Sequence, residues 1–438
     1  MLSAVDRRSH GDDSRRPITH HAQSEGFVRL IIYSHDTFGL GNIRRSLVIC
    51  KHLNQSISDL STLIVTGSPM LHRFRIPEGV DYIKLPCLKR DEAGDLAVRY
   101  VRNLEVREVV ALRRDALFSI IRSFKPDVLL VDKKPGGMAG ELIPSIEDLK
   151  FTRPNAKVVL LLRDILDSPS QTVNFWKRHR HYELLANYYD AVLVLGERQL
   201  FDVCAEYRFP PAARAIVKYC GYIARERGAG TRDELRHQFG VSESEQLVVV
   251  TTGGGEDGYH LIHNYLSGLE YLPADNRPTS LVITGPELGA SKQAEIYSLA
   301  SRHERVQIME FTDDMMAFLY AADVVVSMGG YNTICEILSL RKRAVIVPRI
   351  RPVCEQWIRA ERMAARGLFR AIHPDRITPE SLMKEVSAEL SAQRICPLTA
   401  ATINMDALPR IAEFMNHLRL TIEFGQHGQW SLEASVGT

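Results

Sequence analysis

Short runs of β-branched and apolar residues alternate with helix-length segments along almost the whole chain, and this alternation restricts the fold most. Runs that are apolar on both faces are typical of parallel strands covered by helices. The sequence therefore predicts an α/β fold with doubly wound parallel sheets. Strands are expected at residues 28–34, 60–67, 81–86, 127–132, 157–164, 191–196 and 216–222, and then at 246–252, 279–284, 306–311, 323–327, 343–348 and 368–372.

A charged, glycine-rich break at Arg225–Gly230 separates these two series of strands. A chain of 438 residues is too long for one hydrophobic core and suits two domains. We therefore expect tandem domains at residues 26–222 and 231–400, between a disordered arm (1–25) and a C-terminal helix and tail (401–438) that packs back across both domains. Since ligands of such sheets bind beyond the carboxyl ends of the strands, two facing domains would form an interdomain cleft.

Composition excludes several classes of protein. The net charge is only +2, so nucleic acid is not an expected partner. The seven cysteines form no CxxC pair, which argues against a zinc site or a disulfide framework and indicates a reducing compartment. No apolar run reaches the length of a spanning helix, and the polar first 25 residues lack a signal-peptide core. A cytoplasmic location is expected.

Three glycine turns follow directly after predicted strands, at Gly39–Gly41, Gly253–Gly255 and Gly329–Gly330. Successive free amides at such turns form a nest for anions, so the sequence predicts a ligand that carries phosphate. None of the turns matches the P-loop pattern GxxxxGK[ST], and the GxGxxG pattern that begins at Gly39 is broken by Arg44. Neither a P-loop nor a dinucleotide cofactor is indicated.

The third turn is the most informative, because it connects a predicted strand at 323–327 to a helix that starts near Asn332. Helix-start amides are unpaired and attract anions. Glu336, one turn into the helix, could accept hydrogen bonds from the vicinal hydroxyls of a ribose. The alternative is that Thr333 and Glu336 only form a capping box at the start of the helix.

The segment Glu310–Glu336, continued through Arg349–Gly367, resembles the nucleotide-sugar half of glycosyltransferase family 28, which includes the peptidoglycan N-acetylglucosaminyltransferase that makes lipid II. This resemblance implies a GT-B architecture of two Rossmann-like domains, an N-terminal acceptor domain and a C-terminal nucleotide-sugar domain. It implies transfer of a hexosyl group from a nucleotide diphosphate-sugar, expected to be a UDP-sugar, to an unknown acceptor (a glycan, a lipid or a small molecule), without a metal or another cofactor.

The resemblance also assigns roles to residues of the C-terminal domain. Phe311 and Thr312 would face the base, Glu336 would bind the ribose, and Glu355 with Gln356 would bind the donor sugar. The diphosphate and the pocket around it are assigned to Gly329, Gly330, Thr333, Gly253, Gly254 and Gly255. The structural alternatives are a core aromatic for Phe311 and a solvated helix start for Glu355 and Gln356.

Two further segments are implied to reach the same ligand. Gly221–Arg225 resembles the family's interdomain segment GNPVR, which makes Arg225 a candidate phosphate clamp, although it could equally be linker charge. In the N-terminal domain, Gly39 and Gly41 supply the first glycine turn.

The residue expected to take a proton is missing. Family members commonly carry a histidine where this chain has Asn42, and an amide cannot accept a proton at physiological pH. The other catalytic candidates lie at predicted strand ends: His35, Asp36 and Asp164, with Asp132 and Asp167 as further acids. A structural histidine is the alternative for His35, and loop contacts with Lys133 and Arg163 are the alternative for Asp132 and Asp164.

The substitution at Asn42 keeps two other functions open, hydrolysis of a nucleotide-sugar and non-catalytic binding of one. Peripheral contact with the inner face of the membrane is a further expectation, with Phe175–Arg178 as the docking patch. Burial of Trp176 is the alternative for that patch.

Overall fold

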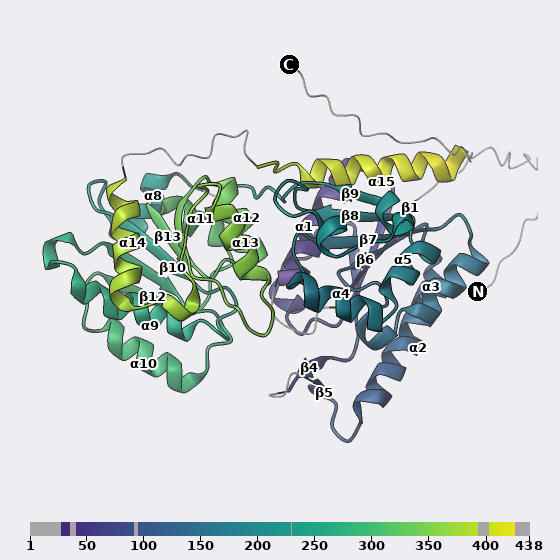
Figure 1. Cartoon of the computed structure of the whole chain (residues 1–438), viewed down its shortest axis with the longest axis horizontal. Coiled ribbons are helices and arrows are strands. Elements are labelled where there is room, and N and C mark those ends of the chain that lie inside the picture. Colours follow the sequence, from purple (N-terminus) through teal and green to yellow (C-terminus); the bar gives the residue numbers. More distant parts are fainter. Residues whose placement is uncertain (1–27, 36–40, 92–94, 229, 393–402, 425–438) are drawn as a thin grey trace, which may run out of the picture.

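The computed structural model describes residues 28–35, 41–91, 95–228, 230–392 and 403–424. The predicted arm at 1–25, most of the predicted tail, and the candidate residues Asp36 and Gly39 lie outside these residues. Two parallel sheets, each with helices on both faces, lie side by side (Figure 1). The predicted α/β class is confirmed.

The first sheet has the order β3-β2-β1-β6-β7-β8-β9, and every neighbouring pair is parallel. Its strands are β1 (Val28–Ser34), β2 (Leu60–Thr66), β3 (Val80–Lys84), β6 (Val128–Asp132), β7 (Lys157–Arg163), β8 (Ala191–Leu195) and β9 (Val217–Tyr219). The helices in this half are α1 (Gly41–Ser56), α2 (Val106–Phe124), α3 (Ile143–Thr152), α4 (Pro169–Arg178), α5 (His181–Tyr188), α6 (Val203–Glu206) and α7 (Pro211–Ala215).

The second sheet has the order β12-β11-β10-β13-β14-β15 and is also parallel throughout. Its strands are β10 (Leu247–Thr251), β11 (Thr279–Ile283), β12 (Val306–Met309), β13 (Val324–Ser327), β14 (Arg343–Ile346) and β15 (Arg370–Ala371). The helices after the linker are α8 (Arg232–Gln238), α9 (Tyr259–Gly268), α10 (Ala290–Ala300), α11 (Met315–Ala321), α12 (Tyr331–Ser339), α13 (Glu355–Ala364), α14 (Pro379–Ser391) and α15 (Ala407–Phe424).

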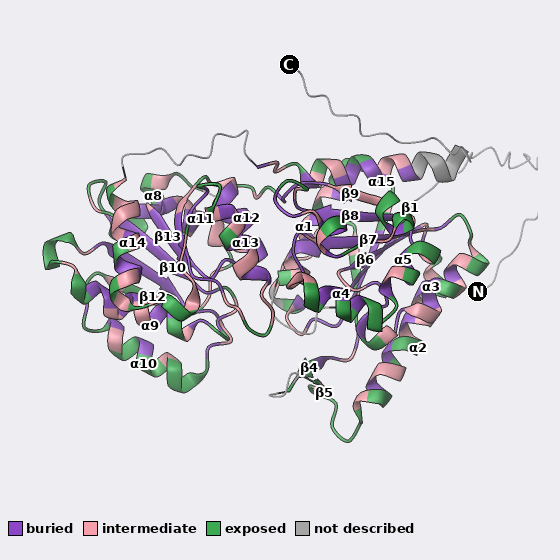
Figure 2. Cartoon of the chain, viewed as in Figure 1, coloured by how far each residue is buried: buried purple, intermediate pink, exposed green. Residues whose placement is uncertain are grey.

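The strands are where the sequence predicts them because their residues are apolar on both faces. All residues of β6, β8, β10, β11 and β13 are buried, and Figure 2 shows the strands buried between half-exposed helices. The small antiparallel pair β4 (Leu88–Arg90) and β5 (Leu96–Val98) was not predicted. Each of these strands is only three residues long, too short for a periodic pattern.

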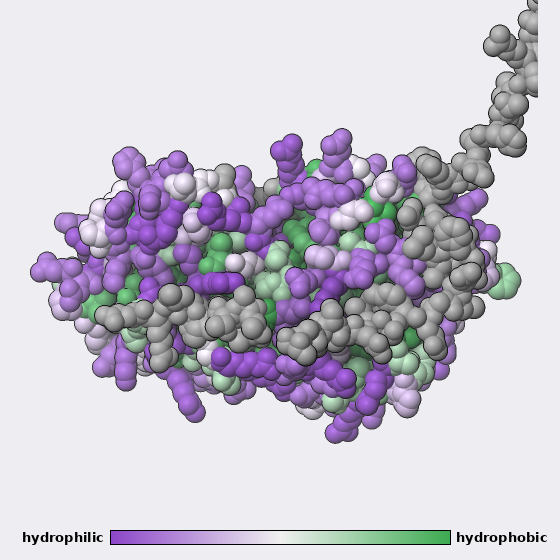
Figure 3. Space-filling view, turned by 90° about the horizontal axis from the view of Figure 1, so that it is seen from above, coloured by the Kyte–Doolittle hydropathy of each residue, from purple (hydrophilic) through white to green (hydrophobic). Residues whose placement is uncertain are grey.

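After α14 the chain returns from the second domain to the first, where α15 packs against α1 (Figure 1). Ile223 and Asp406 form an isolated antiparallel bridge, and the Tyr222 amide donates to the Asn404 carbonyl at 2.7 Å. The interdomain segment is therefore held by the returning chain. Hydrophilic residues dominate the uncovered part of the face that carries α15, with apolar residues in small groups between them (Figure 3).

The carboxyl ends of β1, β6 and β7 face the loops that follow β13 and β14 of the other domain. Arg362–Glu206 and Arg366–Glu197 are partly exposed ion pairs between the domains. Four further arginine–carboxylate pairs lie at or beside this interface, three of them between the domains: Arg44–Glu336, Arg45–Asp132, Arg163–Glu355 and Arg359–Asp164. Most of these side chains are removed from water. The ligand-binding edges of the two sheets are therefore apposed.

Candidate functional site

The Gly329–Gly330 turn connects β13 to α12 at the domain interface. Gly329 has φ +75°, and a Cβ atom there would lie 2.6 Å from Ile346 Cγ2, so the turn requires glycine. Gly330 is the N-cap of α12 and has no side chain to cap it. The amides of Tyr331, Asn332 and Thr333 therefore lack an intrahelical acceptor. Because the helix begins at Tyr331, Thr333 is not an N-cap and the capping-box alternative is wrong.

The helix starts of both domains meet at Asn332. Its Nδ2 donates to the Gly41 carbonyl at the start of α1 at 2.9 Å, and its Oδ1 accepts from Arg225 Nη2 at 3.0 Å. The Arg225 amide also donates to Ser339 Oγ at the other end of α12. The structure thus brings Gly41, Arg225 and the third glycine turn together. Burial lowers the pKa of Arg225, and no carboxylate of the described residues is paired with its guanidinium.

Glu336 lies one turn into α12 and is only 1% exposed. Its Oε1 accepts from Arg44 Nη2 of the other domain at 2.9 Å. Its Oε2 is buried and has no hydrogen-bond partner. The sequence predicted exposed amides and an open carboxylate at this turn, whereas the N-terminal domain covers most of it and Arg44 occupies the carboxylate.

Glu355 and Gln356 begin α13 and also face the first domain. Arg163 contacts both carboxylate oxygens of Glu355, at 3.1 and 2.6 Å. Burial opposes ionisation of Glu355, but the charges of Arg163 and Lys133 outweigh it and hold the pKa at about 2. Gln356 Oε1 accepts from the Arg349 amide at 3.2 Å. Since Glu355 is buried and paired, the solvated-helix-start alternative is wrong.

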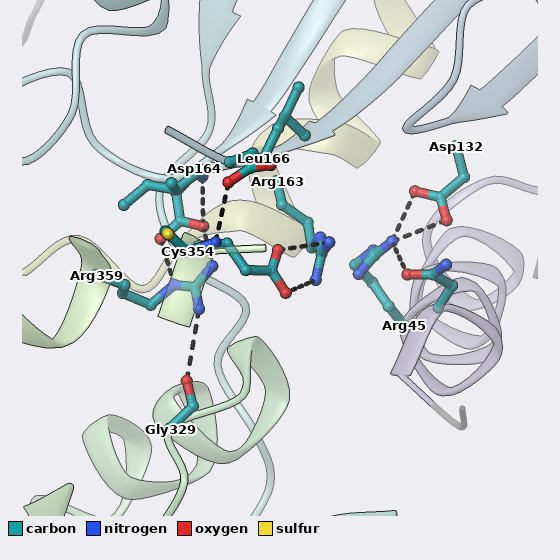
Figure 4. A network of polar contacts seen from close by, with 12 residues as sticks. Arg45, Asp132, Arg163, Asp164, Leu166, Gly329, Cys354 and Arg359 are labelled. Carbon is teal, nitrogen blue, oxygen red and sulfur yellow. Dashed lines mark hydrogen bonds and ion pairs between the residues drawn. The ribbon is translucent and has the colours of Figure 1, made fainter. Parts of the chain in front are cut away.

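Asp164 is bound by Arg359 in a two-armed pair, with both N–O distances 2.8 Å (Figure 4). Its Oδ2 also accepts from the Tyr222 hydroxyl at 2.9 Å, and its Oδ1 from the Ile165 amide. Arg359 extends to the Gly329 carbonyl at 3.5 Å. This buried network joins the domains directly beside the glycine turn. In the structure Asp164 is an interdomain contact, and its catalytic role remains a prediction.

Three further catalytic candidates, Asn42, Asp132 and His35, lie around Arg45, whereas Asp167 accepts from the Cys354 amide of the other domain at 2.9 Å. Arg45 Nη2 donates to both oxygens of Asp132 and to Asn42 Oδ1 at 3.0 Å (Figure 4). His35 is buried, with Nδ1 3.1 Å from the Asp132 carbonyl oxygen. Burial, with the charges of Lys134 and Lys133, holds the pKa of His35 well below its ordinary value. His35 is therefore neutral at physiological pH and is a weak base.

Lys133 follows β6 and has a left-handed backbone, with φ +67°. Such a conformation is strained for a residue with a Cβ and is frequent at functional sites. Burial, reinforced by Arg163, lowers the pKa of Lys133 to about 7, although the carboxylates of Glu355 and Asp132 act in the opposite direction. A lysine with this pKa is neutral for part of the time at physiological pH and can accept a proton.

The Gly253–Gly255 turn follows β10, which pairs with β13 in register Thr251 to Ser327, so the two glycine turns are neighbours. Gly253 and Gly255 have positive φ values. A Cβ at Gly254 would lie 2.8 Å from a carboxylate oxygen of Glu287, whose pKa burial raises. With this acid beside it, the turn is less suited to a phosphate than the start of α12.

Phe311 and Thr312 follow the edge strand β12 and are half-buried. Thr312 Oγ1 accepts from the Asp314 amide at 3.2 Å, and Asp314 in turn caps α11 by accepting from the Ala317 amide. Asp314 is thus a helix cap rather than part of a metal-binding acid pair. Within the described residues, no group of three or more His, Cys, Asp or Glu is arranged to hold a metal ion.

The docking patch predicted at Phe175–Arg178 is only partly exposed. Trp176 is 3% exposed and packs against Phe209 and Tyr182, so the alternative that Trp176 is buried is confirmed. Phe175 is 42% exposed. Over the described part of the chain, no helix combines the length and apolarity needed to cross a bilayer.

Sequence reasoning missed four residues that build the interface: Arg44, Arg163, Arg359 and Asn332. Their partners lie about 190 to 290 positions away in the sequence, as the separations of 195 for Arg359–Asp164 and 292 for Arg44–Glu336 show. In the sequence, the one sign of the three arginines as interface residues is that they lie next to predicted strand ends or helix starts.

Solved structures with the same architecture identify the fold as GT-B. A glycosyltransferase of kitacinnamycin superposes with a TM-score of 0.60 at 16% identity, covering 89% of this chain and 99% of the other. MurG of Acinetobacter baumannii gives 0.56 at 13%, with the same coverage. A Listeria monocytogenes protein assigned as a UDP-N-acetylglucosamine 2-epimerase gives 0.59 at 12%, covering 93% and 100%. The chain therefore has two Rossmann-like domains of the GT-B type, as expected.

One family model matches the C-terminal domain, and curated relatives match part of the chain. Residues 247–405 match the glycosyltransferase family 28 C-terminal domain. An uncharacterised glycosyltransferase of Methanopyrus kandleri is 26% identical over 160 residues, which cover 35% of this chain and 41% of that protein. The UDP-N-acetylglucosamine–N-acetylmuramyl-(pentapeptide) pyrophosphoryl-undecaprenol N-acetylglucosamine transferase of Haemophilus influenzae is 28% identical over 177 residues, 39% and 48% of the two lengths. The chain spans less than half the length of these relatives, and its match to family 28 covers residues 247–405.

Proposed function

We propose that this protein transfers a hexosyl group from a nucleoside diphosphate-sugar, preferably a UDP-sugar, to an acceptor held by the N-terminal domain. The observation that carries the proposal is the uncapped start of α12 at the domain interface, one turn from the buried, half-satisfied carboxylate of Glu336. Helix-start amides suit a diphosphate, and a carboxylate suits the two hydroxyls of a ribose. The family 28 match over residues 247–405 supports this assignment.

In this proposal an acceptor hydroxyl oxygen attacks the anomeric carbon as its proton passes to neutral Lys133. The bond from that carbon to the diphosphate breaks, and the nucleoside diphosphate leaves. The leaving diphosphate is stabilised by the amides of Tyr331–Thr333 and by Arg225. Glu355 and Gln356 would hold the donor sugar after Arg163 gives up part of its contact with Glu355. Fixed amides and arginines supply the charge stabilisation that a metal ion supplies elsewhere, so transfer is proposed to need no metal.

A nucleotide panel followed by a transfer assay tests the proposal. Calorimetric titration with UDP, GDP, ADP and dTDP is expected to select one nucleotide, with UDP favoured. The corresponding sugar nucleotides should then lose their sugar only when an acceptor is added. Absence of binding throughout the panel would contradict the proposal. Sugar release without an acceptor would instead support hydrolysis, and tight binding with no turnover would support a binding protein, the two functions that Asn42 keeps open.

The name of one relative points to a class of acceptor. The Haemophilus influenzae relative acts, by its name, on a pyrophosphoryl-undecaprenol acceptor. We therefore propose a lipid-linked acceptor and action at the cytoplasmic face of the membrane, through peripheral contact. Sedimentation with anionic vesicles, compared with neutral ones, tests the membrane contact. A chain that stays in the supernatant with both would contradict it.

Turnover is expected to depend on pH through the proton acceptor. Because Lys133 accepts a proton only when neutral, and its pKa is about 7, turnover should fall by about tenfold per pH unit below pH 7 and level off above it. Steady-state kinetics from pH 5.5 to 9 measure this profile. Lys133→Met should abolish the rising limb while leaving nucleotide affinity unchanged. A limb that persists in this variant would assign the proton acceptor to another group.

Replacement of Asn42 by alanine is expected to impair turnover more than binding. The amide Oδ1 accepts from Arg45, and loss of one such hydrogen bond should lower the turnover rate by about 3- to 10-fold through mispositioning of Arg45. Comparison of kcat with the dissociation constant of the nucleotide measures the difference. A fully active variant would remove Asn42 from the site.

A further inference from the structure

We propose that Arg44 is a phosphate-binding residue of the donor site, and that Glu336 binds the Arg44 guanidinium while the site is empty. On binding, the ribose hydroxyls take over the Glu336 carboxylate, and the released guanidinium of Arg44 moves to the diphosphate. This inference rests on the proposed function, since it assigns the order in which parts of the same ligand engage the site.

The ion pair between Arg44 and Glu336 is incomplete, which distinguishes it from its neighbours. Arg359 binds Asp164 with two nitrogens, and Arg163 lies within ion-pair distance of both oxygens of Glu355, although Oε2 of Glu355 accepts no hydrogen bond. Arg44 contributes one nitrogen to one oxygen of Glu336, and the second oxygen is buried without a partner. An unsatisfied buried acceptor is costly, so this carboxylate is poised to accept a ligand donor.

A vicinal diol can satisfy both oxygens of Glu336, because its two hydroxyls can donate to the two oxygens of one carboxylate. Arg44 cannot do so from its present position, and it is the partner that can leave. Glu336 is 1% exposed and fixed within α12, whereas the Arg44 side chain is 32% exposed and enters from the other domain. The exchange therefore replaces a one-point contact with a two-point contact and frees the Arg44 guanidinium for the diphosphate.

The released guanidinium is already beside the expected phosphate position. Arg44 lies in the first turn of α1, and the start of α1 is bound to the start of α12 through Gly41 and Asn332. Glu336 follows Asn332 by four residues, about 6 Å along the helix axis. Torsional rotation of Arg44 can therefore carry its guanidinium from the carboxylate to the helix start.

The charges at the interface favour the same exchange. Among the described residues, Arg44, Arg45, Arg163 and Arg359 are each opposed by a carboxylate, whereas the Arg225 guanidinium donates to the Asn332 side chain. A nucleoside diphosphate-sugar brings a negative charge on each phosphate. Arg225 alone offsets one of these charges, and Arg44 offsets the other once a neutral diol has taken its place on Glu336. The starts of α1 and α12 add roughly half a positive charge each.

Titrations with UDP and with uridine test the exchange, with binding measured by calorimetry or ligand-observed NMR. The chains compared are the wild type, Arg44→Gln and the control Lys51→Gln. Lys51 lies on the same helix and pairs with the exposed Glu226, so its replacement tests for general damage to α1. In Arg44→Gln we expect UDP to bind roughly 10- to 100-fold more weakly. Uridine, which has no phosphate and no longer competes with an ion pair, should bind about threefold more tightly or better. Lys51→Gln should change neither affinity.

The opposite directions of the two effects are the decisive result. Parallel weakening of UDP and uridine would overturn the exchange, because Arg44 would then only support the shape of the site. Unchanged UDP affinity would overturn the phosphate role. If the panel selects GDP, then GDP and guanosine serve as the pair of probes. Failure of the wild-type chain to bind any nucleoside diphosphate is a different outcome, which contradicts the proposed function itself.

Discussion

Replacement of Asp164 by alanine is expected to lower the free energy of unfolding by about 3–5 kcal/mol, because it leaves the guanidinium of Arg359 buried without its carboxylate. Arg359 is 0% and Asp164 1% exposed, so water cannot readily replace the lost partner. The pair joins β7 of the first domain to α13 of the second. The variant should therefore also uncouple the domains, giving two thermal transitions in place of one in differential scanning calorimetry.

Four variants separate this structural role from catalysis by Asp164. Arg359→Met should destabilise the chain about as much as Asp164→Ala, and the double variant Asp164→Leu with Arg359→Met should recover much of the stability, since apolar replacement of a whole buried pair is often tolerated. Arg107→Gln, which removes an exposed arginine paired with Glu105, is the surface control and should change stability little. A stable but inactive Asp164→Asn, beside an active Arg359→Met, would instead establish Asp164 as a catalytic residue.

Replacement of Glu336 by alanine is expected to weaken UDP binding by about 10- to 100-fold. This is the change in affinity expected from the loss of one or two hydrogen bonds to a charged group. The structural cost should be small, because one oxygen of Glu336 is unsatisfied and Arg44 is partly solvated. Titration with UDP and with 2′-deoxy-UDP measures the effect. The wild-type chain should prefer UDP, whose ribose presents both hydroxyls, and the variant should bind the two nucleotides equally.

The controls for this prediction are the thermal transition of Glu336→Ala and the affinity of Glu105→Gln. Glu105 is an exposed acid on the other domain, and its replacement should leave both affinities unchanged. A retained preference for UDP over the deoxynucleotide in Glu336→Ala would show that another group binds the 2′-hydroxyl of the ribose. A collapsed thermal transition would show that Glu336 is primarily structural.

Much of the fold could be predicted because parallel strands buried on both faces have a distinctive sequence pattern. Most predicted strand ranges begin within about three residues of the first residue of the observed strand, and the order of elements is as expected. The glycine requirement at Gly329 was also predictable, since a sharp turn between strand and helix excludes a Cβ. The pair β4–β5 was not predicted, because three-residue strands carry no periodicity.

The site was predictable in part. Gly330, Glu336 and Glu355 lie at the domain interface that the sequence indicated, and Arg225 reaches the start of α12. The arginines that oppose the acids were not foreseen, because their partners are distant in sequence and no local pattern marks an interdomain ion pair. For the same reason, the burial of Glu336 beneath Arg44 is visible only in the structure. Asp36 and Gly39 lie outside the described residues and stay predictions.

A crystal structure of the chain with bound UDP would show whether the donor site lies at the start of α12. We expect diphosphate oxygens within hydrogen-bond distance of the amides of Tyr331–Thr333, ribose hydroxyls on Glu336, and the Arg44 guanidinium moved from that carboxylate to a phosphate. Nucleotide bound elsewhere, with the pair between Arg44 and Glu336 unchanged and the start of α12 unoccupied, would contradict this expectation.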